Sequence, residues 1–175
     1  MRKTLCALVL MLIPATVLAA DAVWKPVLAD LLKSDKPDFG RLSGVVVNHD
    51  TGCVFVNLSD RGIYCSGAGA TSFNPLSDKA AAGPDKKFVT ALKEANGVLH
   101  DRIRGKDAKH LFELTRAGIV ESTDGGLTWS RPIALPKELK DGTDSTWIEY
   151  DPKNDILYIM KTGSDLYKLK LTRGK

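Results

Sequence analysis

Cysteine, histidine and the motifs of cofactor chemistry are scarce in this chain. Its 175 residues include three cysteines and three histidines, and neither type recurs at the spacing of a zinc site. A glycine-rich phosphate loop, a dinucleotide fingerprint and a nucleophile elbow are all absent from the sequence. We therefore expect no metal ion and no cofactor, and the sequence identifies no catalytic residues.

A strong charge of one sign is also missing. The chain has 25 basic and 21 acidic residues, and loss of Arg2 and Lys3 with a leader would leave 23 against 21, a net charge of +2. The charges alternate in sign along the chain, without a basic stripe for nucleic acid or a polybasic patch for a membrane. We expect no nucleic-acid partner and, after removal of the leader, no membrane association.

The one long apolar stretch lies at the N-terminus. Two basic residues precede an uncharged run from Leu5 to Leu18, and small residues follow up to Ala20, which is the three-part pattern of a secretory signal. A membrane anchor is the alternative, but the run is shorter than the ~20 residues of a spanning helix and contains Pro14. We expect residues 1–20 to be a cleaved signal peptide and residues 21–175 to form one secreted or periplasmic domain.

Cleavage would leave two cysteines, Cys53 and Cys65. Export would place both in a compartment that permits disulfides. Cysteines on neighbouring strands can form a bridge only if the hairpin puts both side chains on one face. The sequence leaves two alternatives open, a Cys53–Cys65 disulfide and two buried thiols.

An internal repeat organises the mature chain. Residues 45–65 align without a gap with residues 148–168, pairing "VNHDTGCVFVNLSDRGIY" with "YDPKNDILYIMKTGSDLY". Each copy alternates apolar stretches with polar turns, which is the pattern of antiparallel strands. A looser central copy has strands expected at 109–115 and 118–122. The repeat predicts an all-β fold of antiparallel meanders.

Two connecting segments allow different interpretations. The stretch "WKPVLADLLKSD" from Trp24 resembles "WSRPIALPKELKD" from Trp129, so the N-terminus is expected to add a fourth strand to a blade begun elsewhere; an amphipathic helix over 21–33 is the alternative. Segment 77–97 carries helix start and stop signals but could equally hold a strand at 88–92.

The sharpest local motif is "STDGGLTW", from Ser122 to Trp129. It resembles the Asp box, or BNR repeat, of bacterial sialidase-type β-propellers, sortilin-type receptors and photosystem-assembly-factor-like proteins. Ser122, Asp124 and Thr128 can hydrogen-bond within such a loop, Gly126 supplies backbone freedom, and Trp129 is expected to pack beneath the loop. The resemblance implies a structural role at the periphery, away from any central site.

A degenerate copy of the motif follows the first repeat. The stretch "SGAGATSF", Ser66 to Phe73, aligns without a gap with the Asp box. Ala68 replaces the aspartate and Ala70 replaces the second glycine. We expect this loop to be held by something other than the usual carboxylate.

The resemblance implies a shortened propeller, since the mature chain has room for only three to four blades of ~45 residues. A small closed ring, a half-propeller that pairs with a partner or forms a homodimer through open blade edges, and a shortened remnant all fit. The arginine cluster and the tyrosine–glutamate pair of sialidases are not recognisable; Arg131-Pro132-Ile133 resembles their Arg-Ile-Pro motif only in scrambled order. The sequence therefore favours a non-catalytic binding or assembly module for an unknown protein or glycan. The alternatives are a sialidase-like glycoside hydrolase and a self-associating remnant.

Overall fold

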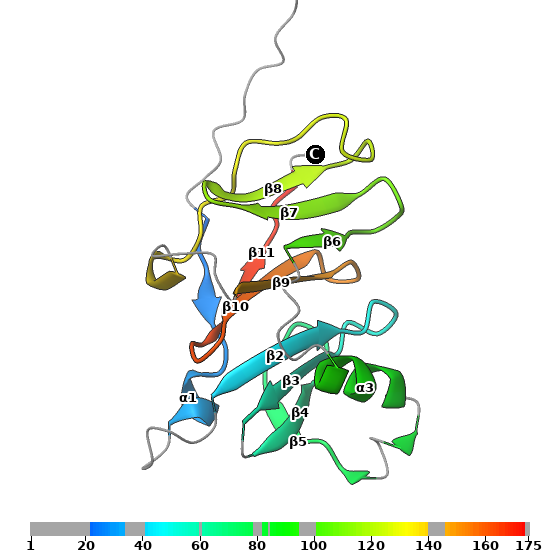
Figure 1. Cartoon of the computed structure of the whole chain (residues 1–175), viewed down its shortest axis with the longest axis vertical. Coiled ribbons are helices and arrows are strands. Elements are labelled where there is room, and N and C mark those ends of the chain that lie inside the picture. The colour runs from blue at the N-terminus through cyan, green and yellow to red at the C-terminus, as the bar shows by residue number, and fades with distance from the viewer. Residues whose placement is uncertain are drawn as a thin grey trace, which may run out of the picture.

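The chain is all-β apart from short helices. A computed structural model describes residues 22–33, 41–59, 61–78, 82–83, 85–94, 101–139 and 146–173, and within them eleven strands form three antiparallel sheets of three or four strands. The expected signal peptide and its cleavage site lie outside these residues. Figure 1 shows the three sheets along the long axis of the molecule, with the sheet that comes last in sequence in the middle.

The first sheet has the strand order β2-β3-β4-β5. Its strands are β2 (Leu42–Val47), β3 (Val54–Leu58), β4 (Gly62–Ser66) and β5 (Phe73–Pro75). Valines, leucine and phenylalanine dominate β2 and β3, and such side chains suit a pleated surface that is buried. Both strands are accordingly buried along most of their length.

The second sheet contains β6 (Arg102–Arg104), β7 (Leu111–Thr115) and β8 (Gly118–Ser122). The segment after the β8 loop returns along β8 and forms an antiparallel bridge between Ile133 and Ile119. The two backbone hydrogen bonds of this bridge are 3.0 and 2.7 Å long. Gly118 permits the approach, because a Cβ atom there would lie 2.1 Å from the carbonyl oxygen of Ile133. This return segment satisfies part of the free edge of β8.

The central sheet joins both ends of the chain. It consists of β9 (Thr146–Asp151), β10 (Ile156–Lys161) and β11 (Leu166–Lys170), and β1 (Lys25–Pro26) pairs with β11. The fourth strand expected from the N-terminus is therefore confirmed. The alternative, a helix over 21–33, is reduced to the single turn of α1 (Ala29–Leu32).

The repeat seen in the sequence corresponds to matching strands. Strands β2, β3 and β4 of the first sheet align with β9, β10 and β11 of the central sheet at the offset that the sequence predicts. The order of pairing is the same, since the middle strand of each set pairs with its two neighbours. Two parts of the chain with similar residue patterns thus fold into similar meanders.

The central sheet is covered on both faces. Tyr158 and Met160 of β10 belong to the core shared with the first sheet, whereas Leu157 and Ile159 belong to the core shared with the second sheet. All four side chains are fully buried. Burial of the three aliphatic side chains, Leu157, Ile159 and Met160, stabilises the fold by about 1.5–3 kcal/mol each relative to exposure, so β10 joins the three sheets.

Helix α3 (Lys86–Glu94) packs against β2 and β3 of the first sheet. The rings of Phe88 and Phe55 are stacked with centroids 5.3 Å apart, and Leu92 is buried beside Gly44, where a Cβ atom would lie 3.3 Å from it. Phe55 faces away from the core shared with the central sheet, because its neighbours on β3 belong to that core. The helical interpretation of segment 77–97 is confirmed for these residues, and a strand at 88–92 is wrong.

Candidate functional site

The loop after β8 is held by one carboxylate. Asp124 accepts hydrogen bonds from the Ser122 hydroxyl at 2.8 Å, from the Thr128 amide at 2.9 Å and from the Thr128 hydroxyl at 2.6 Å. The Ser122 oxygen accepts a bond from the Gly126 amide at 2.8 Å. Gly125 and Gly126 have φ angles of 80° and 91°, which glycine adopts without steric cost. These bonds close the loop at the end of the second sheet.

The Thr128 hydroxyl and amide, followed by the Ser122 hydroxyl, lower the pKa of Asp124 to about 2. Each of these donors favours the charged form of the carboxylate. Asp124 is therefore ionised at neutral pH and engaged within its own loop.

Trp129 lies against this loop but is not buried beneath it. The Cζ2 atom of its indole would lie 3.4 Å from a Cβ atom on Gly126, and the Arg102 guanidinium lies 5.9 Å from the ring centroid. The side chain is 37% exposed. Trp129 thus packs against the loop as expected, but part of its indole remains exposed to solvent.

The degenerate loop after β4 is held by a lysine from another sheet. Gly69 and Ala70 have φ angles of 80° and 49°, positive at the same aligned positions as Gly125 and Gly126. The ammonium of Lys168 on β11 donates hydrogen bonds to the carbonyl oxygens of Gly69 and Ala70, at 2.6 and 3.1 Å. The ammonium thus does for this loop what the Asp124 carboxylate does for its counterpart, and it also links the first and central sheets.

The turns at 48–52 and 151–155 are equivalent in the repeat and have equivalent bonds. The side-chain oxygen of Asn48 accepts a bond from the amide of Asp50 at 3.0 Å, and Asp151 accepts one from the amide of Lys153 at 3.0 Å. These are the bonds of Asx turns. The carboxylate of Asp151 is fully buried and its role is to shape the turn.

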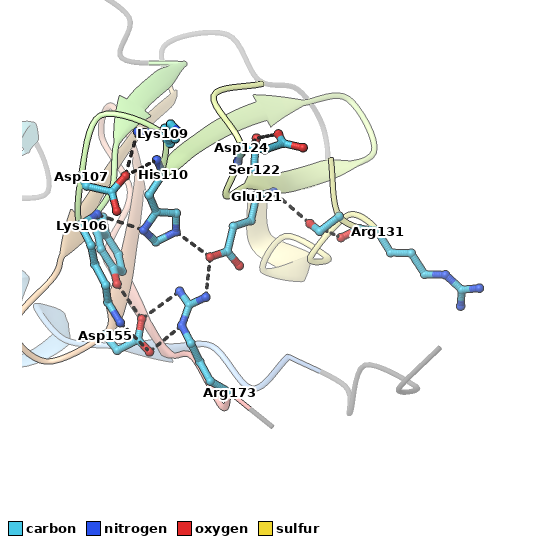
Figure 2. Close-up of polar contacts among 12 residues, drawn as sticks. Lys106, Asp107, Lys109, His110, Glu121, Ser122, Asp124, Arg131, Asp155 and Arg173 are labelled. Atoms are coloured by element: carbon cyan, nitrogen blue, oxygen red, sulfur yellow. Dashed lines mark hydrogen bonds and ion pairs between the residues drawn. The ribbon is translucent and has the colours of Figure 1, made fainter. Parts of the chain in front are cut away.

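A network of charged side chains joins the second and central sheets (Figure 2). Arg173, just beyond β11, donates from Nε and Nη2 to the two oxygens of Asp155, at 2.8 and 3.0 Å. Its Nη1 donates to Glu121 of β8 at 2.5 Å. The Tyr150 hydroxyl donates to Asp155 at 2.7 Å. One guanidinium therefore binds a carboxylate from each sheet, and its two-pronged contact with Asp155 fixes its orientation.

His110 extends the network into the core. Its side chain is 5% exposed, and its Nδ1 accepts a hydrogen bond from the Lys106 amide at 2.9 Å. The proton of the neutral ring therefore lies on Nε2, which is 2.6 Å from a Glu121 oxygen and donates to it. Gly105 makes room for the ring, since a Cβ atom there would lie 2.3 Å from Nδ1.

The electrostatics of the network favour fixed charges. Burial alone would raise the pKa of Asp155, but the Arg173 guanidinium and the Tyr150 hydroxyl outweigh it and lower that pKa below its usual range. Burial and the neighbouring Asp155 raise the pKa of Tyr150, and hydrogen bonds to Asp155 and Glu121 raise that of Arg173. Each carboxylate binds a cation and a neutral donor, Asp155 through both of its oxygens and Glu121 through one.

Cys53 and Cys65 are free, half-buried thiols. Cys65 pairs with Phe55 across β3 and β4, so Cys53 lies on the same face but two residues away from the position opposite Cys65. The disulfide that the sequence left open is not formed in this arrangement. Burial raises the pKa of the Cys65 thiol, which keeps it protonated at neutral pH.

Sequence reasoning did not find the charged network. His110, Glu121, Asp155 and Arg173 come from three distant stretches of the chain, and Arg173 lies beyond the repeat. One signal was present in the sequence: the repeat places Asp155 at the position of Gly52. The structure shows why this position is unusual, because Asp155 has a φ angle of 53°, in the left-handed region that glycine favours.

Comparisons with known proteins identify no relative. No protein-family model matches the chain, and neither the curated proteins nor the solved structures contain a match. In the part of the chain that the structure describes, no cluster of three or more His, Cys, Asp or Glu side chains could hold a metal ion. No helix in those same ranges is both long and apolar enough to cross a bilayer.

Arg173→Ala should destabilise the protein by about 1 kcal/mol, because it leaves Glu121 and Asp155 without their shared cation. The side chain is 36% exposed, so solvent screening keeps the loss below that of a fully buried pair. Urea unfolding measures it. Lys33→Ala, which removes the exposed ion pair with Asp30, is the control and should leave the midpoint unchanged. Equal midpoints for the two variants would contradict a bridging role for Arg173.

Asp124→Asn should destabilise the protein at neutral pH and lose its effect in acid. The folded pKa of about 2 lies below the usual 3.8, so the ionised form stabilises the fold above about pH 4 and this contribution is lost as the pH falls towards 2. Urea midpoints of both proteins across this range test it, with the exposed Asp101→Asn as control. A difference that stays constant down to pH 2 would be inconsistent with the hydrogen-bonded carboxylate.

Proposed function

We propose that the mature chain is an exported, non-catalytic binding or assembly module built from three blade-like sheets of the Asp-box propeller type. The support lies in the loops: the motif from Ser122 to Trp129 has the internal bonds expected of its sequence. Its degenerate counterpart has positive φ angles at the two aligned positions. Agreement of residue pattern with backbone conformation in both loops favours a common blade design.

The observation that carries the non-catalytic role is the state of the carboxylates. Glu121 and Asp155 are partly buried acids that come from different sheets, and Arg173 binds both. A glycoside hydrolase needs one carboxyl group free to donate a proton and another free to attack or to activate water. In this network the Tyr150 and Arg173 donors occupy both oxygens of Asp155, and the His110 and Arg173 donors share one oxygen of Glu121. This arrangement suits a structural role in which the network holds the second and central sheets together.

In this proposal, three segments of the chain cover surfaces that neighbouring blades would cover in a full propeller. The N-terminal strand β1 completes the central sheet, the Ile133 segment lies along β8, and α3 covers the first sheet. Three sheets can then be stable without closing into a ring, because each of these segments covers a sheet edge or face that would otherwise favour association. The outer face of the second sheet is then the surface left for a partner.

A panel of fluorogenic glycosides, including a sialoside, tests the proposal with the purified mature protein. We expect no hydrolysis above that of an Asp155→Asn, Glu121→Gln double variant, because Arg173 binds both acids within the network. Circular dichroism of both proteins checks that they are folded. Turnover by the natural sequence that disappears in the folded double variant would contradict the proposal and favour the glycoside hydrolase alternative.

A further inference from the structure

The outer face of the second sheet, on the side away from the central sheet, is only partly buried. Strand alternation places Phe112 and Leu114 towards the central sheet, where both are buried. The alternate positions Leu111, Glu113 and Val120 point the other way and are half-buried. We call this surface, from β6 across β7 to β8 with the loop that ends at Trp129, the open face.

Apolar side chains stand at one end of the open face. Leu127 is 85% exposed and Trp129 is 37% exposed, and they are two of the three large apolar side chains with such exposure in the described ranges. The would-be Cβ of Gly126 lies 3.8 Å from Leu111, so the loop adjoins the half-buried apolar residues of the sheet. Contiguous exposed apolar side chains mark contact sites for other macromolecules, and tryptophan is among the residues that contribute most to protein interfaces.

Both cations and carboxylates surround these residues. Arg102 and Arg104 lie on β6 with exposed side chains, and Lys109 is exposed just before β7. The open face has two carboxylates: Glu113 pairs with Arg102, and Asp124 accepts hydrogen bonds from Ser122 and Thr128 within its own loop. Within the residues that the structure describes, the charged groups of the Arg104 and Lys109 side chains form no ion pair. The open face therefore combines an apolar end with two uncompensated cations.

A second copy of the chain is a poor match for this surface. At the opposite end of the molecule α3 covers the first sheet and exposes Lys86 and Lys87. Stacking one molecule on the next would bring these lysines towards Arg104 and Lys109, and pairing two open faces would oppose arginines. Like charges at such contacts are unfavourable.

We propose that the open face binds an acidic segment of another protein, with Leu127 and Trp129 as apolar anchors and with Arg104 and Lys109 pairing with carboxylates. This inference rests on the proposed function and adds the chemistry of the partner. A protein fits better than a glycan because aliphatic Leu127, Leu111 and Val120 offer contacts for apolar side chains. Tryptophan and arginine together are also the residues most enriched where protein interfaces gain their affinity.

The test measures binding of a synthetic peptide, in which glutamate alternates with valine, to the mature protein by titration calorimetry. We expect binding that weakens as salt is added, because the charge contacts are exposed, and no binding of the matching lysine–valine peptide. Arg104→Glu with Lys109→Glu should weaken binding by about tenfold. The matched reversal at the other end, Lys86→Glu with Lys87→Glu, should leave it unchanged. Leu127→Ser removes an exposed side chain and should weaken binding without changing the urea midpoint.

Several results would overturn the inference. Failure of the acidic peptide to bind would do so, as would equal losses in the two charge-reversal variants, which would indicate unspecific attraction. Preference for a sulfated oligosaccharide would indicate a glycan ligand. A dimer in light scattering that dissociates on Arg104→Glu would identify a second copy as the occupant. These results leave the glycoside assay untouched, so failure of the inference is distinguishable from failure of the proposed function.

Discussion

Burial of β10 on both of its faces is the constraint on which the rest of the structure depends. Its sequence, Ile156 to Met160, is a continuous apolar run without the polar alternation of a half-solvated strand. Such a strand is stable only between two layers, and the first and second sheets supply them. This explains why a sheet formed by the last strands of the chain, together with the first, occupies the middle of the molecule.

Polar contacts at the loop ends complement this apolar centre. Lys168 connects the central sheet to the first sheet through two carbonyl oxygens, and Arg173 connects it to the second through two carboxylates. Partly buried ion pairs contribute little net stability once desolvation is counted, but they penalise other alignments of the groups that they join. We infer that apolar burial holds the sheets together and that these cations fix how they are aligned.

The sequence predicted what depends on local pattern and failed where distant parts of the chain meet. The repeat indicated the strands of the first and central sheets, and Trp24 indicated the N-terminal strand. Segment 77–97 was ambiguous because Phe88, Val89 and Leu92 fit a helix face and a strand equally well. The order in which the three sheets stack could not be predicted. The alternation of apolar and polar residues along a strand shows that one face of its sheet is buried, but it does not show which sheet covers that face. For the same reason the partners of Arg173, which are 18 and 52 residues away, could not be found from a local pattern.

Native-state hydrogen exchange, resolved strand by strand, tests most directly whether the central sheet organises the molecule. Amides of β9 and β10 should exchange most slowly and only through global unfolding, because opening them removes the packing surface of both other sheets. Amides of the first and second sheets should exchange faster, each through its own partial opening, with β10 still protected. Protection of β2 and β3 or of β7 and β8 that exceeds that of β10, or that survives its opening, would contradict this account.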